Sequence, residues 1–197
     1  TTAEYYQSNM LITARNDKQL LLDCGGDIRF SLSECKPAGK HFNNTCLYEE
    51  TFDQEIDAIY ISHLHSDHIG GMEWMAFKTY FTPNFERPKL FMEANLMVEM
   101  WESSLKGGLG CIQGKCMHLT DYFDCRSLDP GGAFDWEGIR FSLVRMPHII
   151  TGYKDFYSYG LVMKELGEQG PAVFITTDTQ FQSSIITEIA QKTAIIF

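Results

Sequence analysis

The most informative stretch of the chain is His63-Leu64-His65-Ser66-Asp67-His68, which directly follows the apolar run Ile56-Asp57-Ala58-Ile59-Tyr60-Ile61-Ser62. The run is typical of a β-strand, so the cluster lies on a loop at the end of a strand. Buried imidazoles and carboxylates without partners are costly, and protonated imidazoles repel one another. A divalent metal ion removes both costs, because neutral imidazole and carboxylate are good zinc ligands. The stretch therefore predicts a metal site.

The spacing within the cluster predicts two ions rather than one. Alternate residues of a strand point to the same side, so His63 and His65 can share one ion. Asp67 and His68 come after the chain begins to turn and could serve a second ion nearby. Gly70-Gly71 then allows a tight turn into a helix. We expect that helix over residues 72–79, with one face formed by Met72, Met75, Ala76 and Thr79.

Two later residues extend the predicted site. His148 follows the apolar run Ile139 to Pro147, and Asp178 ends the apolar run Val173 to Thr177. Alone, a histidine at a strand end is usually structural, and an aspartate there is usually a turn or helix-cap residue. Taken with the first cluster, both become candidate metal ligands.

These residues resemble the signature of the metallo-β-lactamase-fold hydrolases, which reads His-x-His-x-Asp-His, then a single His, then a bridging Asp, then a last His. Asn9 to Ile12 and Leu20 to Gly25 resemble the opening hairpin of that fold, with Asp23 as the acidic end of its second strand. The resemblance runs from about Asn9 to residue 197. It implies an α/β fold, the αββα sandwich of two mixed sheets packed face to face with helices outside.

Within that superfamily the chain is similar to tRNase Z and to the phage anti-Pycsar phosphodiesterases, which degrade cyclic CMP and cyclic UMP. The similarity rests on Ile61-Ser62-His63, Gly70-Gly71-Met72-Glu73 and Thr177-Asp178-Thr179-Gln180. It implies a metal-dependent hydrolase of phosphodiester bonds that acts on a cyclic nucleotide. The alternatives are an RNA 3′-end endonuclease resembling tRNase Z and a nucleotide-binding module that has lost turnover.

The resemblance also assigns roles to residues and implies two divalent cations, zinc first and manganese as the alternative. The first ion is expected on His63, His65 and His148, and the second on Asp67, His68 and Asp178, with Asp178 bridging. Asp67 is the expected catalytic residue, which orients the attacking hydroxide. Asn9, Tyr153 and Tyr159 are the expected substrate contacts. Several aromatic residues follow His148 and are candidates to stack on a nucleobase, with core packing as the alternative: Tyr153, Phe156, Tyr157 and Tyr159.

One part of the family signature has no counterpart, because no histidine follows His148. Three explanations are open at this stage. The C-terminal region is incomplete, another chain supplies the ligand, or the second metal site is vestigial.

Length, composition and net charge indicate the number of domains and the kind of partner. A chain of 197 residues with 44% hydrophobic residues is expected to form one domain, residues 1–197. The net charge of −10 disfavours extended nucleic acid and favours a small anionic nucleotide as the partner. No apolar stretch is long enough to span a bilayer, and Thr1 begins no cleavable signal, so we expect a cytoplasmic protein, by family resemblance a homodimer.

The six cysteines are expected to be reduced thiols. Cys111 and Cys116 could hold a structural zinc, but two free loop cysteines are the favoured interpretation. They lie in or beside the segment Gly107 to Lys115, whose four glycines indicate a loop at the surface, with a lid or a dimer contact as the alternatives. Hairpins are predicted over residues 9–23, turning at Asn16-Asp17, and over 133–147, turning at Glu137-Gly138.

Overall fold

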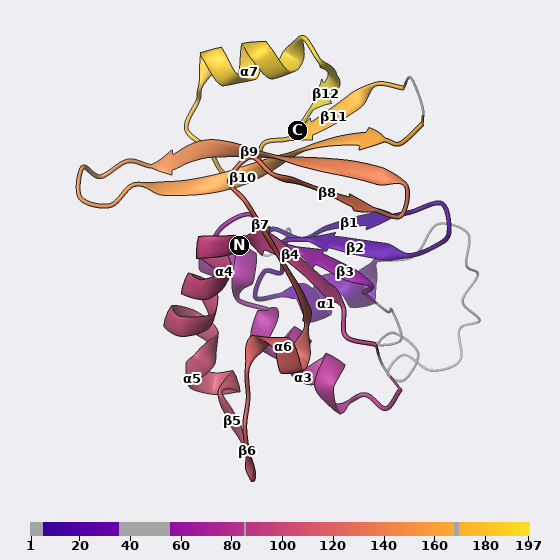
Figure 1. Ribbon diagram of the computed structural model, residues 1–197, viewed down its shortest axis with the longest axis vertical. Helices are drawn as coiled ribbons and strands as arrows, with labels where there is room; N and C mark the ends of the chain where they lie inside the picture. The colour runs from indigo at the N-terminus through magenta and orange to yellow at the C-terminus, as the bar shows by residue number, and fades with distance from the viewer. Residues whose placement is uncertain (1–5, 36–55, 85, 168–169) are drawn as a thin grey trace.

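The computed structural model describes residues 6–35, 56–84, 86–167 and 170–197. Two five-stranded sheets pack face to face, with strand orders β1-β2-β3-β4-β7 and β12-β11-β10-β9-β8 (Figure 1). The first sheet comprises β1 (Met10–Thr13), β2 (Gln19–Leu22), β3 (Ala58–Tyr60), β4 (Lys89–Glu93) and β7 (Asp124–Leu128). The second comprises β8 (Ala133–Trp136), β9 (Ile139–Ile149), β10 (Phe156–Glu165), β11 (Ala172–Ile175) and β12 (Thr193–Ile196).

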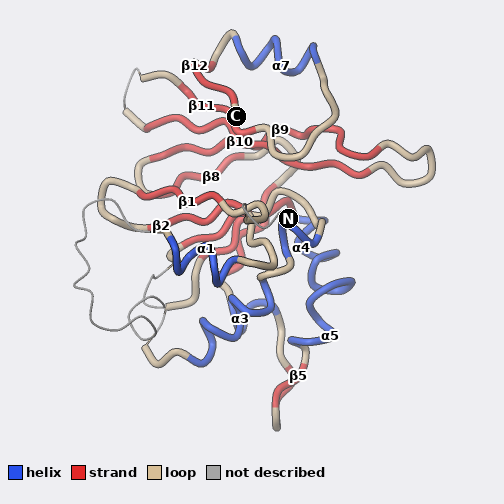
Figure 2. Tube along the Cα trace, turned by 180° about the vertical axis from the view of Figure 1, so that it is seen from behind, coloured by secondary structure: helices blue, strands red, loops and turns tan. Residues whose placement is uncertain are grey.

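Helices lie on the outer side of each sheet, which confirms the predicted αββα sandwich (Figures 1 and 2). Most of the helices lie on the side of the first sheet, and α7 (Ser183–Ala190) covers the second. The first group comprises α1 (Ile28–Glu34), α2 (Ser66–Ile69), α3 (Met72–Phe81), α4 (Ala94–Met100), a π-helical turn (η1, Trp101–Leu105), α5 (Lys106–Leu109) and α6 (Leu119–Tyr122).

The central strands of the first sheet, β2, β3 and β4, are buried on both faces, and β2 shows how its sequence achieves this. All four residues of Gln19–Leu22 are buried. Leu21 packs with the helices, whereas Leu20 and Leu22 pack between the two sheets with Tyr60, Phe134 and other residues. The alternation of side chains along a strand thus divides one apolar run between two cores.

The helix after the histidine cluster matches its prediction. Its buried residues are Met72, Met75, Ala76 and Thr79, the four residues expected on one face. Both predicted hairpins are also present. In the second, Glu137 and Gly138 have φ of 46° and 81°, which a primed turn requires.

The glycine-rich segment differs from its prediction as a loop. Gly107 and Gly108 lie in α5, which extends the helical run that starts at Ala94. The rest forms a small hairpin of β5 (Cys111–Ile112) and β6 (Lys115–Cys116), which projects from the helical side of the molecule (Figure 1). Tertiary packing of Leu105 and Leu109 outweighs the low helix propensity of the glycines.

The described cysteines, Cys24, Cys35, Cys111, Cys116 and Cys125, are all free thiols, and Cys46 lies outside the described residues. Cys111 and Cys116 face each other across the β5–β6 hairpin. No group of metal-binding donors in the described part of the chain includes either of them. Across the same described ranges, the helices are too short or too polar to cross a bilayer.

Candidate metal centre

The histidine cluster lies at the junction of β3 and α2, at the end of the first sheet, with His63 and His65 on the connecting loop and Asp67 and His68 in α2. His65 is the N-cap residue of α2, and the carbonyl oxygen of His65 accepts a hydrogen bond from His68 N at 2.9 Å. Backbone bonds from Cys24 N to His68 O and from Gly71 N to Cys24 O tie this loop to the end of β2. The local sequence therefore places four candidate donors on a short segment that is anchored at both ends.

A β-bulge directs His148 toward the same place. In the pairing of β9 with β10, Ile149 lies opposite Phe156 and Pro147 lies opposite Tyr157, so His148 has no partner. A bulge of this kind inserts one residue and re-aims its side chain. His148 is therefore positioned by an irregularity of the second sheet and not by the regular alternation of β9.

Asp178 lies three residues after the end of β11, and hydrogen bonds to its own backbone and from the two residues that follow it fix its position. Ser158 Oγ donates a hydrogen bond to the carbonyl oxygen of Asp178. Thr179 Oγ1 and Gln180 N both donate to Pro147 O, which fastens this loop to β9. Thr177 has a φ of 55°, which is uncommon for a β-branched residue, and its buried hydroxyl has no hydrogen-bond partner. Strain of this kind is typical of functional loops.

The structure brings four candidate ligands together in a first group. His63, His65, His148 and Asp178 each offer one donor atom, all within 4.8 Å of one another. His65 Nδ1 lies 3.2 Å from His63 Nε2 and 3.0 Å from His148 Nε2. Nitrogen ligands around a tetrahedral zinc lie about 3.3 Å apart. The imidazole nitrogens are therefore spaced as a single zinc ion would space them.

A second group shares Asp178 with the first. Asp67, His68 and Asp178 also offer donor atoms within 4.8 Å of one another. His68 Nε2 lies 3.7 Å from Asp67 Oδ2 and 3.5 Å from Asp178 Oδ1, and Asp178 Oδ2 lies 3.7 Å from His148 Nε2. One oxygen of Asp178 thus faces each group, which is the arrangement that a bridging carboxylate requires.

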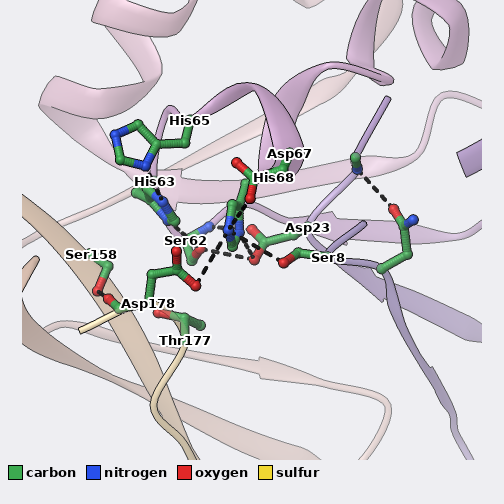
Figure 3. A network of polar contacts seen from close by, with 12 residues as sticks. Ser8, Asp23, Ser62, His63, His65, Asp67, His68, Ser158, Thr177 and Asp178 are labelled. Atoms are coloured by element: carbon green, nitrogen blue, oxygen red, sulfur yellow. Dashed lines mark hydrogen bonds and ion pairs between the residues drawn. The ribbon is translucent and has the colours of Figure 1, made fainter. Parts of the chain in front are cut away.

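Asp23 and Ser62 orient two of the imidazoles, and sequence reasoning missed this role (Figure 3). Asp23 Oδ2 accepts hydrogen bonds from His68 Nδ1 at 2.8 Å and from Ser62 Oγ at 2.9 Å. Ser62 Oγ in turn lies 3.0 Å from His63 Nδ1. A carboxylate only accepts, so His68 carries its proton on Nδ1, and Ser62 accepts the Nδ1 proton of His63.

This relay leaves the Nε2 lone pairs of His63 and His68 free for a metal ion. The sequence did contain a signal for it, namely an acidic residue directly after β2, but its partner could not be identified before the strands were placed. Ser8 also lies near the second group, with its Oγ 3.3 Å from His68 Nε2.

Burial and charge keep part of the site neutral. Burial, with added repulsion from His68, His65 and His148, lowers the pKa of His63 to about 2. Burial and the neighbouring His65 also lower the pKa of His148. For His68, burial opposes protonation, but the hydrogen bond to Asp23 and the charges of Asp23, Asp178 and Asp67 outweigh it and raise its pKa. His63 and His148 therefore offer neutral nitrogens to the first group, and the second group offers concentrated negative charge.

The donor atoms of both groups are therefore suited to bind divalent cations. Three imidazole nitrogens and a carboxylate oxygen match the ligands that zinc takes in proteins. Close acceptor nitrogens without protons repel each other, and a cation between them removes that cost.

The three predicted substrate contacts, Tyr159, Asn9 and Tyr153, stay predictions, and the structure places them in three different environments. Tyr159 is only 6% exposed and packs between the sheets, because the inward side of β10 needs an apolar ring there. The amide of Asn9 accepts from Gly25 N and donates to Asp27 Oδ1, which fixes the loop after β2. Tyr153 is fully exposed on the β9–β10 loop.

Solved structures show the same fold. The metallo-β-lactamase fold protein YhfI from Bacillus subtilis is 17% identical with a TM-score of 0.63, over 95% of this chain and 61% of that one. Yeast PDE1 is 13% identical with a TM-score of 0.73, over 98% of this chain and 69% of that one. Human tRNase Z, short form, is 16% identical with a TM-score of 0.55, over 91% of this chain and 66% of that one. At these identities the likeness concerns the fold alone.

The sandwich and the histidine and aspartate cluster at its mouth define a metallo-β-lactamase-fold protein with a candidate metal centre. "Anti-Pycsar protein Apyc1" of Bacillus phage vB_BveM-Goe7 is 31% identical over 188 residues, which are 93% of this chain and 65% of that protein. The chain belongs to the family described as Anti-Pycsar protein Apyc1, whose family model matches residues 1–197. It spans about two thirds of the length of the relatives that it matches.

Proposed function

We propose that this chain carries the metal centre of a phosphodiesterase that hydrolyses cyclic nucleotides such as cyclic CMP and cyclic UMP. The observation that carries the proposal is the pair of donor groups that share Asp178. The family to which the chain belongs supports the same class of substrate. The negative net charge of the chain favours a small nucleotide over extended RNA.

The proposed chemistry assigns a role to each part of the site. Divalent ions, when bound, acidify water and neutralise charge on a phosphoryl group. His63, His65, His148 and Asp178 would hold the first ion, and Asp67, His68 and Asp178 the second. The Asp67 carboxylate is half-exposed and borders the second group, so it can accept a hydrogen bond from the attacking water and hold it in line with the phosphorus. Asp23 and Ser62 keep the imidazoles in the tautomer that ligation needs.

Zinc as the ion, a homodimer and a cytoplasmic location are further parts of this proposal. The nitrogen-rich first group supports zinc, and the carboxylates of the second group suit manganese as well. Metal analysis of the purified protein tests the first point, and light scattering after size-exclusion chromatography tests the second.

The test of function measures product formation from cyclic CMP and cyclic UMP, with pre-tRNA as the competing substrate, in added zinc or manganese. Wild-type protein is expected to open the cyclic phosphodiester, and His65→Ala is expected to lose this activity while it remains folded. The matched control is His118→Asn, because His118 caps α6 away from the site and asparagine is also a good N-cap. Cleavage of pre-tRNA alone would establish the nuclease instead. Nucleotide binding without product would establish a module that has lost turnover.

A further inference from the structure

Phe156 lies beside the metal-binding cluster and faces solvent. It is the first residue of β10, directly across from Ile149 at the bulge that directs His148. The centroid of its ring is 6.4 Å from that of His65, and the two planes are tilted by 35°. The residue is 40% exposed. An aromatic surface therefore borders the candidate metal site at a position that a bound molecule can reach.

Core packing does not account for this ring. Phe156 belongs to none of the three buried hydrophobic clusters among the described residues. The Nζ of Lys154 lies 5.2 Å from the ring centroid and also forms an ion pair with Glu99 at 2.5 Å. A ring that keeps much of its surface in water gains little from folding, so the exposure of Phe156 is not explained by packing.

The other aromatic residues near His148 are poorer candidates for such a contact. The Tyr157 ring is already covered by the guanidinium of Arg145, whose Cζ lies 3.5 Å from the ring centroid. Tyr159 is buried in the core between the sheets, and Tyr153 projects into solvent without a neighbouring ring. Phe156 is the aromatic residue of this segment that combines exposure with a ring contact to a candidate metal ligand.

We propose that Phe156 is the platform on which the nucleobase of the substrate stacks while the phosphate lies at the metal centre. The proposal rests on the proposed function and adds the residue that recognises the base. In a cyclic nucleotide only one ribose ring separates base from phosphate, so a platform must stand next to the metal ligands, as Phe156 does beside His65. Stacking uses the face that every base has, so this contact favours nucleotides over other phosphodiesters and discriminates little among bases.

The experiment compares binding of cytidine 5′-monophosphate and ribose 5-phosphate to the zinc-loaded protein by titration calorimetry. The two ligands carry the same phosphate and differ in the base. Phe156→Ala is expected to weaken binding of the nucleotide by roughly 5- to 100-fold and to leave ribose 5-phosphate unchanged. Phe156→Trp is expected to restore nucleotide binding. The matched control is Phe30→Ala, because Phe30 is 51% exposed with Arg29 4.7 Å from its ring centroid but lies on α1.

Three results would overturn the inference. In the first, the wild-type protein does not bind the nucleotide. In the second, Phe156→Ala binds the nucleotide as tightly as wild type does. In the third, Phe156→Ala loses affinity for the nucleotide and for ribose 5-phosphate equally. The last result would mean that Phe156 only supports the His65 ring. Hydrolysis of cyclic CMP, measured in parallel, separates this inference from the proposed function. If the protein binds the nucleotide through Phe156 but does not hydrolyse cyclic CMP, the stacking role of Phe156 stands and the proposed phosphodiesterase activity fails.

Discussion

Substitution of Asp23 by asparagine tests whether the orienting network controls metal binding. In the wild-type protein, Asp23 Oδ2 accepts the Nδ1 proton of His68 and the hydroxyl proton of Ser62. The amide nitrogen of asparagine would donate to His68 Nδ1 instead, which moves the imidazole proton to Nε2 and removes the lone pair that faces the second donor group. Loss of such an outer partner weakens metal affinity by roughly 10- to 100-fold, or about 1.4 to 2.7 kcal/mol.

The fold should tolerate this substitution. Asp23 has a φ of 59°, a left-handed conformation that asparagine also adopts readily. The amide oxygen can still accept the hydrogen bond from Ser62 N, now made at 2.8 Å to Asp23 Oδ1. We expect a loss of about 1 kcal/mol in the free energy of unfolding for Asp23→Asn. Asp23→Ala should cost more, because each buried donor left without a partner costs about 1–3 kcal/mol.

The assay is competition for zinc with a chelator of known affinity, run beside urea unfolding of the metal-free protein. Asp57→Asn is the matched control, because Asp57 accepts a backbone hydrogen bond from Gln19 N at 2.8 Å and contacts no imidazole. Zinc affinity equal to wild type in a folded Asp23→Asn protein would refute the tautomer argument. Equal losses in both variants would show that the effect is not specific to the network.

Three further predictions concern the metal centre and its supporting loops. Calorimetric titration with zinc should show one tight ion and a weaker second per chain, because the first group has four donors and the second has three, one of them shared; two equally tight ions would contradict this. Thr177→Gly should raise the free energy of unfolding of the metal-free protein by about 1 kcal/mol in urea, because it removes a β-branched residue in the left-handed conformation whose buried hydroxyl has no partner. A clear loss of stability would contradict this prediction. Gly71→Ala should lower the free energy of unfolding by more than about 2 kcal/mol, because the added Cβ would meet Gly25 O and lie 2.5 Å from Ile28 Cγ2; a melting temperature like that of wild type would contradict it.

Local spacing explains why so much of the site could be predicted from the sequence. His63, His65, Asp67 and His68 lie within six consecutive residues at the junction of β3 and α2, so their spacing alone indicated that they lie close together. The face of α3 and the turn at Glu137-Gly138 were predicted for the same reason, because both depend on residues a few positions apart.

Features that depend on contacts between distant elements were missed. The bulge at His148 exists only because β9 pairs with β10 in a particular register. The bond between Asp23 and His68 joins residues 45 positions apart. Tyr159 was expected to meet substrate because it follows His148 in sequence, and its burial between the sheets is set by the alternation of β10 against the first sheet. Each of these depends on how the two sheets meet, which no local pattern contains.

The candidate ligands of the metal centre are divided between the two sheets, so a bound ion would link the sheets; we call this linkage the clasp. His63, His65, Asp67 and His68 follow β3 of the first sheet, whereas His148 lies in β9 and Asp178 follows β11 of the second. A cation held by both sets cross-links the halves of the sandwich at one edge, so a chelator would release that edge to open first. Hydrogen exchange should then rise at the ends of β3 and β9 nearest the clasp when the metal is removed, while the backbone amides of Leu20 and Leu161 deep between the sheets stay protected.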